Sequence, residues 1–245
     1  MPGSSTPRRR PVVAIDGPAG SGKTTTARAV AEALGFVHLD SGALYRAVTL
    51  LALELPDPPS AWRGEALADL ARRKHVAMVL VRAPVGGHGD TTIEGVSARE
   101  RLRSEAVTRE VSRVAAMAPV RDYVNGILCA LAAEGGVVLD GRDIGTAVFP
   151  DAEVKVFLVA DVPERARRRL LERGRRPDPG SLEAEAEALT RRDDKDSRRD
   201  VAPLARAADA VLLDTTRLTV EQQVRTVVDL VRERFPSLDR IRGRG

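Results

Sequence analysis

Short apolar segments alternate with longer helical patterns along most of the chain, which predicts an α/β fold. The expected strands are runs rich in Val, Ile and Leu at 11–15, 36–39, 137–139, 154–159 and 211–213. Helical composition follows at 23–34, 41–55, 163–173, 182–192 and 220–234. This alternation favours a parallel sheet with helices on both faces, and ligands bind such sheets at the carboxyl ends of the strands.

The middle of the chain has a different pattern. A helix is expected near 61–73, followed by two β-like runs at 76–82 and 91–94. The glycines between these runs, at positions 86, 87 and 89, fit a hairpin loop. Helices are expected next at 97–117 and 119–133. We interpret this part as an insertion into the alternating core.

A glycine-rich segment joins the first predicted strand to the first predicted helix. Its sequence, GPAGSGKT, matches G-x-x-x-x-G-K-[ST] in full. Glycines let successive backbone amides turn inward and bind an anion, and the helix N-terminus adds to that field. A glycine turn with an incidental lysine is disfavoured, because the flanking strand and helix are both present. The expected ATP-binding residues are Gly17, Pro18, Ala19, Gly20, Ser21, Gly22, Lys23, Thr24 and Thr25.

Two of these side chains have a specific chemical role in this motif. Lys23 can reach the β- and γ-phosphates of ATP, and the Thr24 hydroxyl can ligate Mg²⁺. The chain lacks the N-K-x-D motif of a GTPase and an L-S-G-G-Q-like signature of an ABC-type ATPase. Its short length and an arginine-rich segment at 165–176 favour a small kinase with a mobile lid.

Composition narrows the class of protein further. The 245 residues are 43% hydrophobic and 30% charged, which is typical of a globular protein, and no apolar run approaches a membrane span. The net charge of +4 reflects a small excess of 39 basic over 35 acidic residues, and the local cluster of arginines at 165–176 suits a phosphate-rich small ligand as well as a polymer. The single cysteine, Cys129, cannot form an internal disulfide, which fits the cytoplasm, and its apolar context predicts core packing. Residues 1–10 and 240–245 are expected to be disordered, within an N-terminal tail of 1–10 and a C-terminal tail of 235–245.

Three further segments, together with the glycine-rich loop, resemble the bacterial cytidylate kinase family. They are DSGALYR at 40–46, DGRDIG at 140–145, and RDDKDSRR at 192–199 followed by VAP. The similarity runs from about residue 12 to 234. It implies a P-loop NTPase-type core over 11–55, 119–164 and 181–234. It also implies a small α+β CMP-binding insertion over 56–118 and a helical lid over 165–180.

The resemblance also implies an activity and a set of roles. The γ-phosphate of ATP would pass to CMP or dCMP with Mg²⁺ as cofactor, in a cytoplasmic monomer with no nucleic-acid or membrane partner. Catalysis is implied for Lys23, Arg142 and Arg192. Substrate contacts are implied for Ser41; for Arg46, Arg142, Arg192 and Arg199 at the CMP phosphate; for Asp196 at the ribose; and for Ser112, Arg121 and Asp143 at the cytosine.

Elementary chemistry agrees with these roles but leaves alternatives. Arginine forks neutralise the charge that arises when two phosphates approach each other. Arg192, Asp196 and Arg199 would share one helix face if the helix extends that far, although a solvated, salt-bridged face has the same pattern. Another small P-loop kinase, or a nucleic-acid-binding switch, remains open at this stage. The insertion also lacks the family's Gly-x-Asp-Val-Ser segment and has Gly95-Val96-Ser97 instead.

Overall fold

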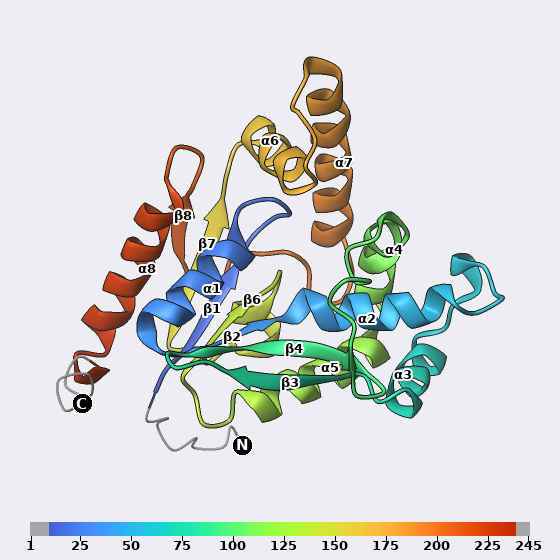
Figure 1. Cartoon of the computed structure of the whole chain (residues 1–245), viewed down its shortest axis with the longest axis horizontal. Coiled ribbons are helices and arrows are strands. Elements are labelled where there is room, and N and C mark those ends of the chain that lie inside the picture. Colours follow the sequence, from blue (N-terminus) through green and yellow to red (C-terminus); the bar gives the residue numbers. More distant parts are fainter. Residues whose placement is uncertain (1–9, 239–245) are drawn as a thin grey trace.

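A twisted sheet of eight strands organises residues 10–238, which are the residues that this computed structural model describes (Figure 1). The strand order is β3-β4-β2-β6-β1-β7-β8, with β5 paired to β4 at the edge. The predicted parallel sheet is confirmed, because neighbouring strands from β2 to β8 all pair in parallel. These strands are β1 (Val12–Asp16), β2 (Val37–Asp40), β6 (Val137–Asp140), β7 (Val154–Val159) and β8 (Val211–Asp214).

Helices cover both faces of this sheet, as the alternating pattern predicts. Val13 and Ile15 of β1 pack into a core with α1 (Lys23–Leu34) and α8 (Val220–Arg234). Val12 and Ala14 point to the opposite face and join a second, larger core. The helices of that second face are α2 (Ser41–Leu53), α3 (Gly64–Arg73), α4 (Glu105–Ala115) and α5 (Ala118–Leu131).

The hairpin of the middle region extends the central sheet. β3 (Ala77–Arg82) pairs antiparallel with β4 (Gly87–Ile93), and β4 also pairs in parallel with β2 at Val37 and His38. The predicted glycine loop was too long, because Gly87 and Gly89 lie within β4. A Cβ on Gly89 would come within 2.3 Å of the Met78 sulfur, so glycine leaves room here for the Met78 side chain.

The predicted helix at 97–117 was wrong over its first part. β5 (Val96–Ser97) pairs with the end of β4, and the Ala98 amide then donates to the Thr91 carbonyl at 2.9 Å. Strand pairing therefore uses the residues that open the predicted helix. Helix α4 begins only after Ser104, whose hydroxyl caps it by accepting from the Val107 amide.

Two helices form the tip of the molecule above the carboxyl end of β7 (Figure 1). They are α6 (Val162–Glu172) and α7 (Pro179–Ser197), joined by residues 173–178. α7 extends five residues beyond its predicted end at 192. Short helical turns at Pro59–Ala61 and Ile144–Val148 complete the elements.

Three predictions about the rest of the chain have different outcomes. Cys129 is exposed on α5, so its predicted core packing was wrong. The predicted tails fall largely on residues 1–9 and 239–245, outside the described residues. Within residues 10–238, no helix has both the length and the apolar character to cross a membrane.

Candidate active site

The glycine-rich loop begins at the carboxyl end of β1 and ends in α1. Gly17, Gly20 and Gly22 have φ values of 147°, 76° and 91°, which side chains other than glycine rarely adopt. At Gly17 a Cβ would also meet the Leu158 carbonyl oxygen at 2.1 Å. The loop therefore needs these glycines for its backbone shape, as expected for a phosphate-binding turn.

Lys23 lies inside this loop. Its Nζ donates to the Pro18 carbonyl oxygen at 2.6 Å, and the residue is only 5% exposed. Burial lowers the pKa of Lys23 well below its usual value, and the neighbouring Arg142 lowers it further. A phosphate group beside Lys23 would oppose both effects, so the position suits an anionic ligand.

Thr24 and His38 both contact the carboxylate that ends β6. The Thr24 hydroxyl donates to Asp140 Oδ2 at 2.6 Å, and His38 Nε2 lies 2.7 Å from Asp140 Oδ1. Burial alone would raise the pKa of Asp140, but the contacts with His38 and Thr24 hold it below its usual value. Ser41, at the start of α2, donates to the Asp140 carbonyl at 2.7 Å. Thr25, by contrast, is exposed on α1.

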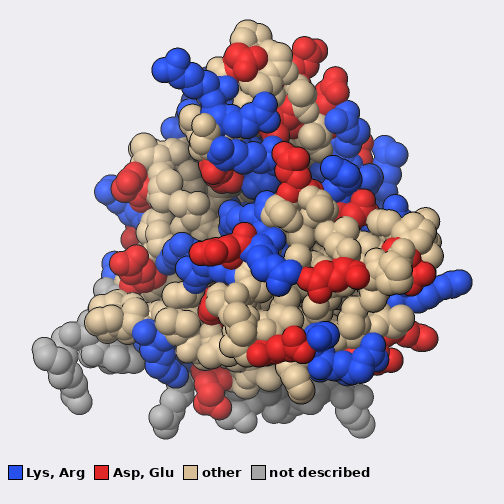
Figure 2. Space-filling model, turned by 45° about the vertical axis from the view of Figure 1, so that its right-hand side comes forward, with Lys and Arg blue, Asp and Glu red and all other residues tan. Residues whose placement is uncertain are grey.

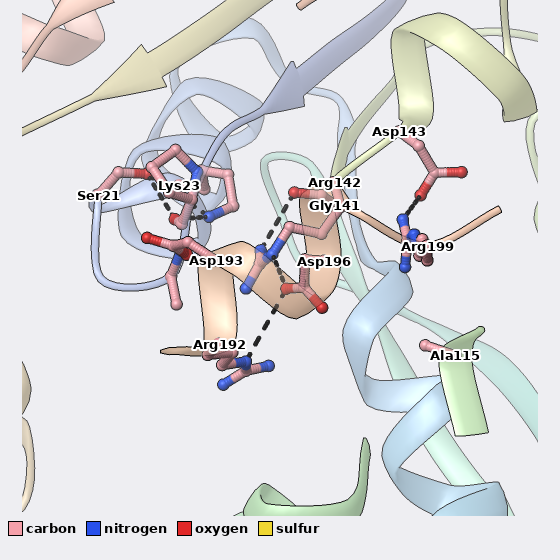
Figure 3. Close-up of polar contacts among 12 residues, drawn as sticks. Ser21, Lys23, Ala115, Gly141, Arg142, Asp143, Arg192, Asp193, Asp196 and Arg199 are labelled. Atoms are coloured by element: carbon pink, nitrogen blue, oxygen red, sulfur yellow. Dashed lines mark hydrogen bonds and ion pairs between the residues drawn. The ribbon is translucent and has the colours of Figure 1, made fainter. Parts of the chain in front are cut away.

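Arginines gather near Asp140, around a hollow that Figure 2 shows below the tip of the molecule. Arg142 Nε donates to Asp196 Oδ2 at 3.1 Å, and Arg192 Nε lies 4.0 Å from the same oxygen (Figure 3). Burial lowers the pKa of Arg192 to about 9, and Arg142 contributes to the shift. Arg46 has its pKa lowered to about 10, mainly by burial. Asp196 thus lies beside two partly buried guanidinium groups, with Arg46 bonded instead to the Leu102 carbonyl and the Thr108 hydroxyl, so positive charge is left for an anion to neutralise.

Asp143 holds the second group of arginines. Arg121 donates to its Oδ2. Arg199 NH2 donates to its Oδ1 at 3.1 Å, and Figure 3 shows these two side chains together. Burial raises the pKa of Asp143, and the two guanidinium groups oppose that rise. Arg121 also donates to the Ala115 carbonyl of α4 at 3.1 Å, and half-buried Ser112 lies one turn earlier on that helix.

The structure changes one expected arrangement. Arg192 and Asp196 share a face of α7, but Arg199 lies beyond the end of that helix at Ser197. Arg199 also donates to the Ala202 carbonyl, in a turn where Ala202 has a φ of 47°. This turn directs Arg199 to Asp143, so Arg199 does not join Arg192 on one helix face.

Sequence reasoning missed several residues around the glycine-rich loop. Arg165 of α6 donates to the Ala19 carbonyl at 3.0 Å and pairs with Asp193, which in turn accepts from the Ala19 amide at 3.1 Å. Arg169 comes close enough to affect the pKa of both Arg46 and Arg192. Buried Nε atoms of Arg165, Arg169 and Arg192 have no hydrogen-bond partner within the described part of the chain. The arginine-rich composition of 165–176 signalled the cluster but not which members point inward.

Comparison with known proteins agrees with this geometry. The family model described as cytidylate kinase matches residues 13–233. A cytidylate kinase of Chlorobaculum tepidum is 44% identical over 227 residues, covering 90% of this chain and 92% of the relative. Those of Limosilactobacillus fermentum and Geobacillus kaustophilus are 47% and 45% identical, covering 86% and 93% of this chain and 91% and 99% of theirs.

The match is long enough to decide the family. It spans the glycine-rich loop, the hairpin region, both arginine groups and the α6–α7 tip, and the relatives are aligned over nearly their full lengths. The predictions of an α/β P-loop kinase fold and of an ATP-dependent nucleoside monophosphate kinase are confirmed. The chain belongs to the cytidylate kinase family.

Proposed function

We propose that this protein transfers the γ-phosphate of ATP to CMP or dCMP, with release of ADP and CDP or dCDP. The observation that carries the proposal is the convergence of two sites at the carboxyl ends of β1 and β6. Lys23 lies in the phosphate loop, and the guanidinium groups of Arg142 and Arg192 lie close enough to depress its pKa. The positive charge at this point would stabilise two phosphate groups brought close together for the transfer.

The donor side of the site uses the glycine-rich loop. Its inward-facing amides and Lys23 hold the β- and γ-phosphates of ATP. The Thr24 hydroxyl and the Asp140 carboxylate are hard oxygen donors, so they fit Mg²⁺, with Thr24 as the ligand. When bound, Mg²⁺ supplies charge neutralisation to the phosphates. Arg165 and Arg169 of α6 complete this side as part of a lid over 165–180.

The acceptor side uses Arg142 and Arg192 beside Asp196, Arg199 beside Asp143, and Arg46 of α2. Arg46, Arg142, Arg192 and Arg199 hold the CMP phosphate, and Asp196 contacts the ribose. An oxygen of the CMP phosphate attacks the γ-phosphorus in line, and the bond to the bridging oxygen of ADP breaks. No covalent enzyme intermediate is needed, because the acceptor phosphate is already anionic at neutral pH.

Asp143 makes the site selective for cytosine over uracil. Cytosine presents an N4 amine that can donate to a carboxylate, whereas uracil presents the O4 acceptor at that position. Arg121 and Ser112 supply donors to the cytosine N3 and O2. Each carboxylate oxygen of Asp143 accepts one arginine in the structure and has capacity for a second donor.

Direct product analysis tests this function. Purified protein incubated with ATP, Mg²⁺ and CMP is expected to form CDP and ADP in equal amounts, by chromatography. The same protein with Lys23→Ala is the control and is expected to form little of either. A site made from groups of one chain supports the proposal of a monomer, and small soluble nucleotide substrates support the proposal of a cytoplasmic enzyme. Absence of CDP from folded protein would refute the proposal.

A further inference from the structure

Asp16 is a buried carboxylate between the two halves of the site. It ends β1, directly before Gly17 of the phosphate loop, and it is 5% exposed. Its Oδ1 accepts from the Ile144 amide at 2.8 Å and its Oδ2 from the Gly145 amide at 2.7 Å. Both amides follow Asp143 in the chain, so one carboxylate fixes the two peptide groups next to the residue proposed to read the base.

The turn that carries Asp143 depends on this support. The Asp143 carbonyl accepts from the Ala147 and Val148 amides at 2.9 and 3.2 Å, at the start of the short π-helix Ile144–Val148. The first amides of any helix have no partner within the helix itself. Asp16 supplies those partners from another strand, and a buried amide without one would be costly.

The other end of Asp16 is equally fixed. The adjoining Gly17 packs so closely on β7 that a Cβ there would meet the Leu158 carbonyl oxygen at 2.1 Å. β1 also pairs with both β6 and β7 up to this point. The carboxylate is therefore anchored to the centre of the sheet, while its two oxygens accept from the turn that carries Asp143.

We propose that Asp16 is a positioning residue for base recognition, which clamps the 143–145 turn against the phosphate loop and so fixes Asp143 for cytosine. This inference rests on the proposed role of Asp143. Asp16 does not itself touch either nucleotide. Its loss acts on the placement of the acceptor base and leaves the grip on ATP intact.

Asp16→Asn tests the clamp with little change of shape. An asparagine offers one acceptor oxygen and turns an NH₂ group toward the other amide, so one of the two contacts is lost. We expect KM for CMP to rise and the CMP-to-UMP ratio of kcat/KM to fall, each by roughly tenfold. KM for ATP should stay within about twofold of wild type. Glu153→Gln is the matched control, because Glu153 accepts from the Val12 amide at the opposite end of β1.

Gly145→Ala tests the same clamp by changing the turn instead of the carboxylate. It provides the test of the proposal if Asp16→Asn does not fold. A Cβ at Gly145 would lie 3.2 Å from Lys155 Cδ and 3.3 Å from Lys155 Cγ, and it would contact Asp16 Oδ2 at 3.4 Å. Relief of the tight contact with Lys155 is expected to shift the 143–145 turn relative to the Asp16 carboxylate. The same kinetic signature is expected. The inference is overturned if folded variants keep both CMP affinity and the CMP-to-UMP ratio, or if KM for ATP rises equally.

Failure of this inference is distinct from failure of the proposed function. If wild-type protein shows no preference for CMP over UMP, the proposed base recognition fails. If wild type discriminates and Asp143→Asn loses that discrimination while Asp16→Asn and Gly145→Ala retain it, base recognition stands and the clamp is wrong.

Discussion

Replacing Asp143 with asparagine separates the two roles that the structure gives this carboxylate. The change keeps the shape of the side chain and removes its charge. Arg121 and Arg199, with side chains only 3% and 5% exposed, then lose their ionised partner. Breaking a buried ion pair costs about 3–5 kcal/mol, and asparagine retains one acceptor, so we expect about 3 kcal/mol. In a protein of this size that loss lowers Tm by roughly 6–12 °C.

The kinetic consequence should depend on the acceptor base. A hydrogen bond from the cytosine amine to a charged acceptor contributes about 1.5–3 kcal/mol, so kcat/KM for CMP should fall by roughly 10- to 150-fold. UMP should lose far less, because the asparagine amide can donate to uracil O4. The assay is steady-state ADP release with each nucleotide, at a temperature well below the lowered Tm.

A neighbouring residue provides the control for this prediction. Asp122 follows Arg121 directly and is exposed on α5, so Asp122→Asn removes a nearby charge without touching the site. Its kinetics and Tm should match those of wild type. If Asp143→Asn lowers kcat/KM for CMP and UMP equally, Asp143 positions the arginines and does not read the base, and the account of base choice is refuted.

Three further predictions concern the donor side, the lid and pH. Lys23→Ala should lower kcat by about 100-fold or more, because the charge on the departing ADP loses its partner; near-normal turnover in folded protein contradicts that role. Proteolysis within 165–180 should slow when an ATP analogue and CMP are both bound, because a closed lid is less accessible. Unchanged cleavage rates would show that this segment does not act as a lid. Burial raises the pKa of Asp16 to about 6, although the hydrogen bonds from the Gly145 and Ile144 amides oppose that rise. As pH falls below that value, Asp16 gains a proton and one of its oxygens stops accepting a hydrogen bond, so KM for CMP should rise in the wild-type protein. Asp16→Asn has no proton to gain at this position and should lack that rise. If KM for CMP depends on pH in the same way in both proteins, titration of Asp16 is excluded as the cause.

The sheet and the phosphate loop were predictable because their signals are local. Each core strand is a short apolar run, and the glycines of the loop lie in one continuous segment beside Lys23. The hairpin boundaries were less predictable, because Gly87 and Gly89 read as loop residues. Only the contact of Gly89 with Met78, across two strands, shows why glycine lies within β4.

The candidate site was predictable in its membership but not in its pairings. The motifs named Arg142, Asp143 and Asp196, yet the sequence placed Arg199 on the face of Arg192. Its true partner, Asp143, is 56 residues away in sequence and is reached through a turn after the helix. Asp16 and His38 had no spacing signal, since each acts on a residue more than 100 positions distant. Such pairings are set by the order of strands in the sheet.

The most direct test of the central claim is ADP release from ATP with each nucleoside monophosphate offered in turn at equal concentration. CMP and dCMP are expected to have the highest kcat/KM, with UMP below them and AMP and GMP near background. The reason is that the site offers a carboxylate acceptor to the exocyclic amine of cytosine and donors to its N3 and O2. A preference for AMP, GMP or a non-nucleotide acceptor would contradict the account.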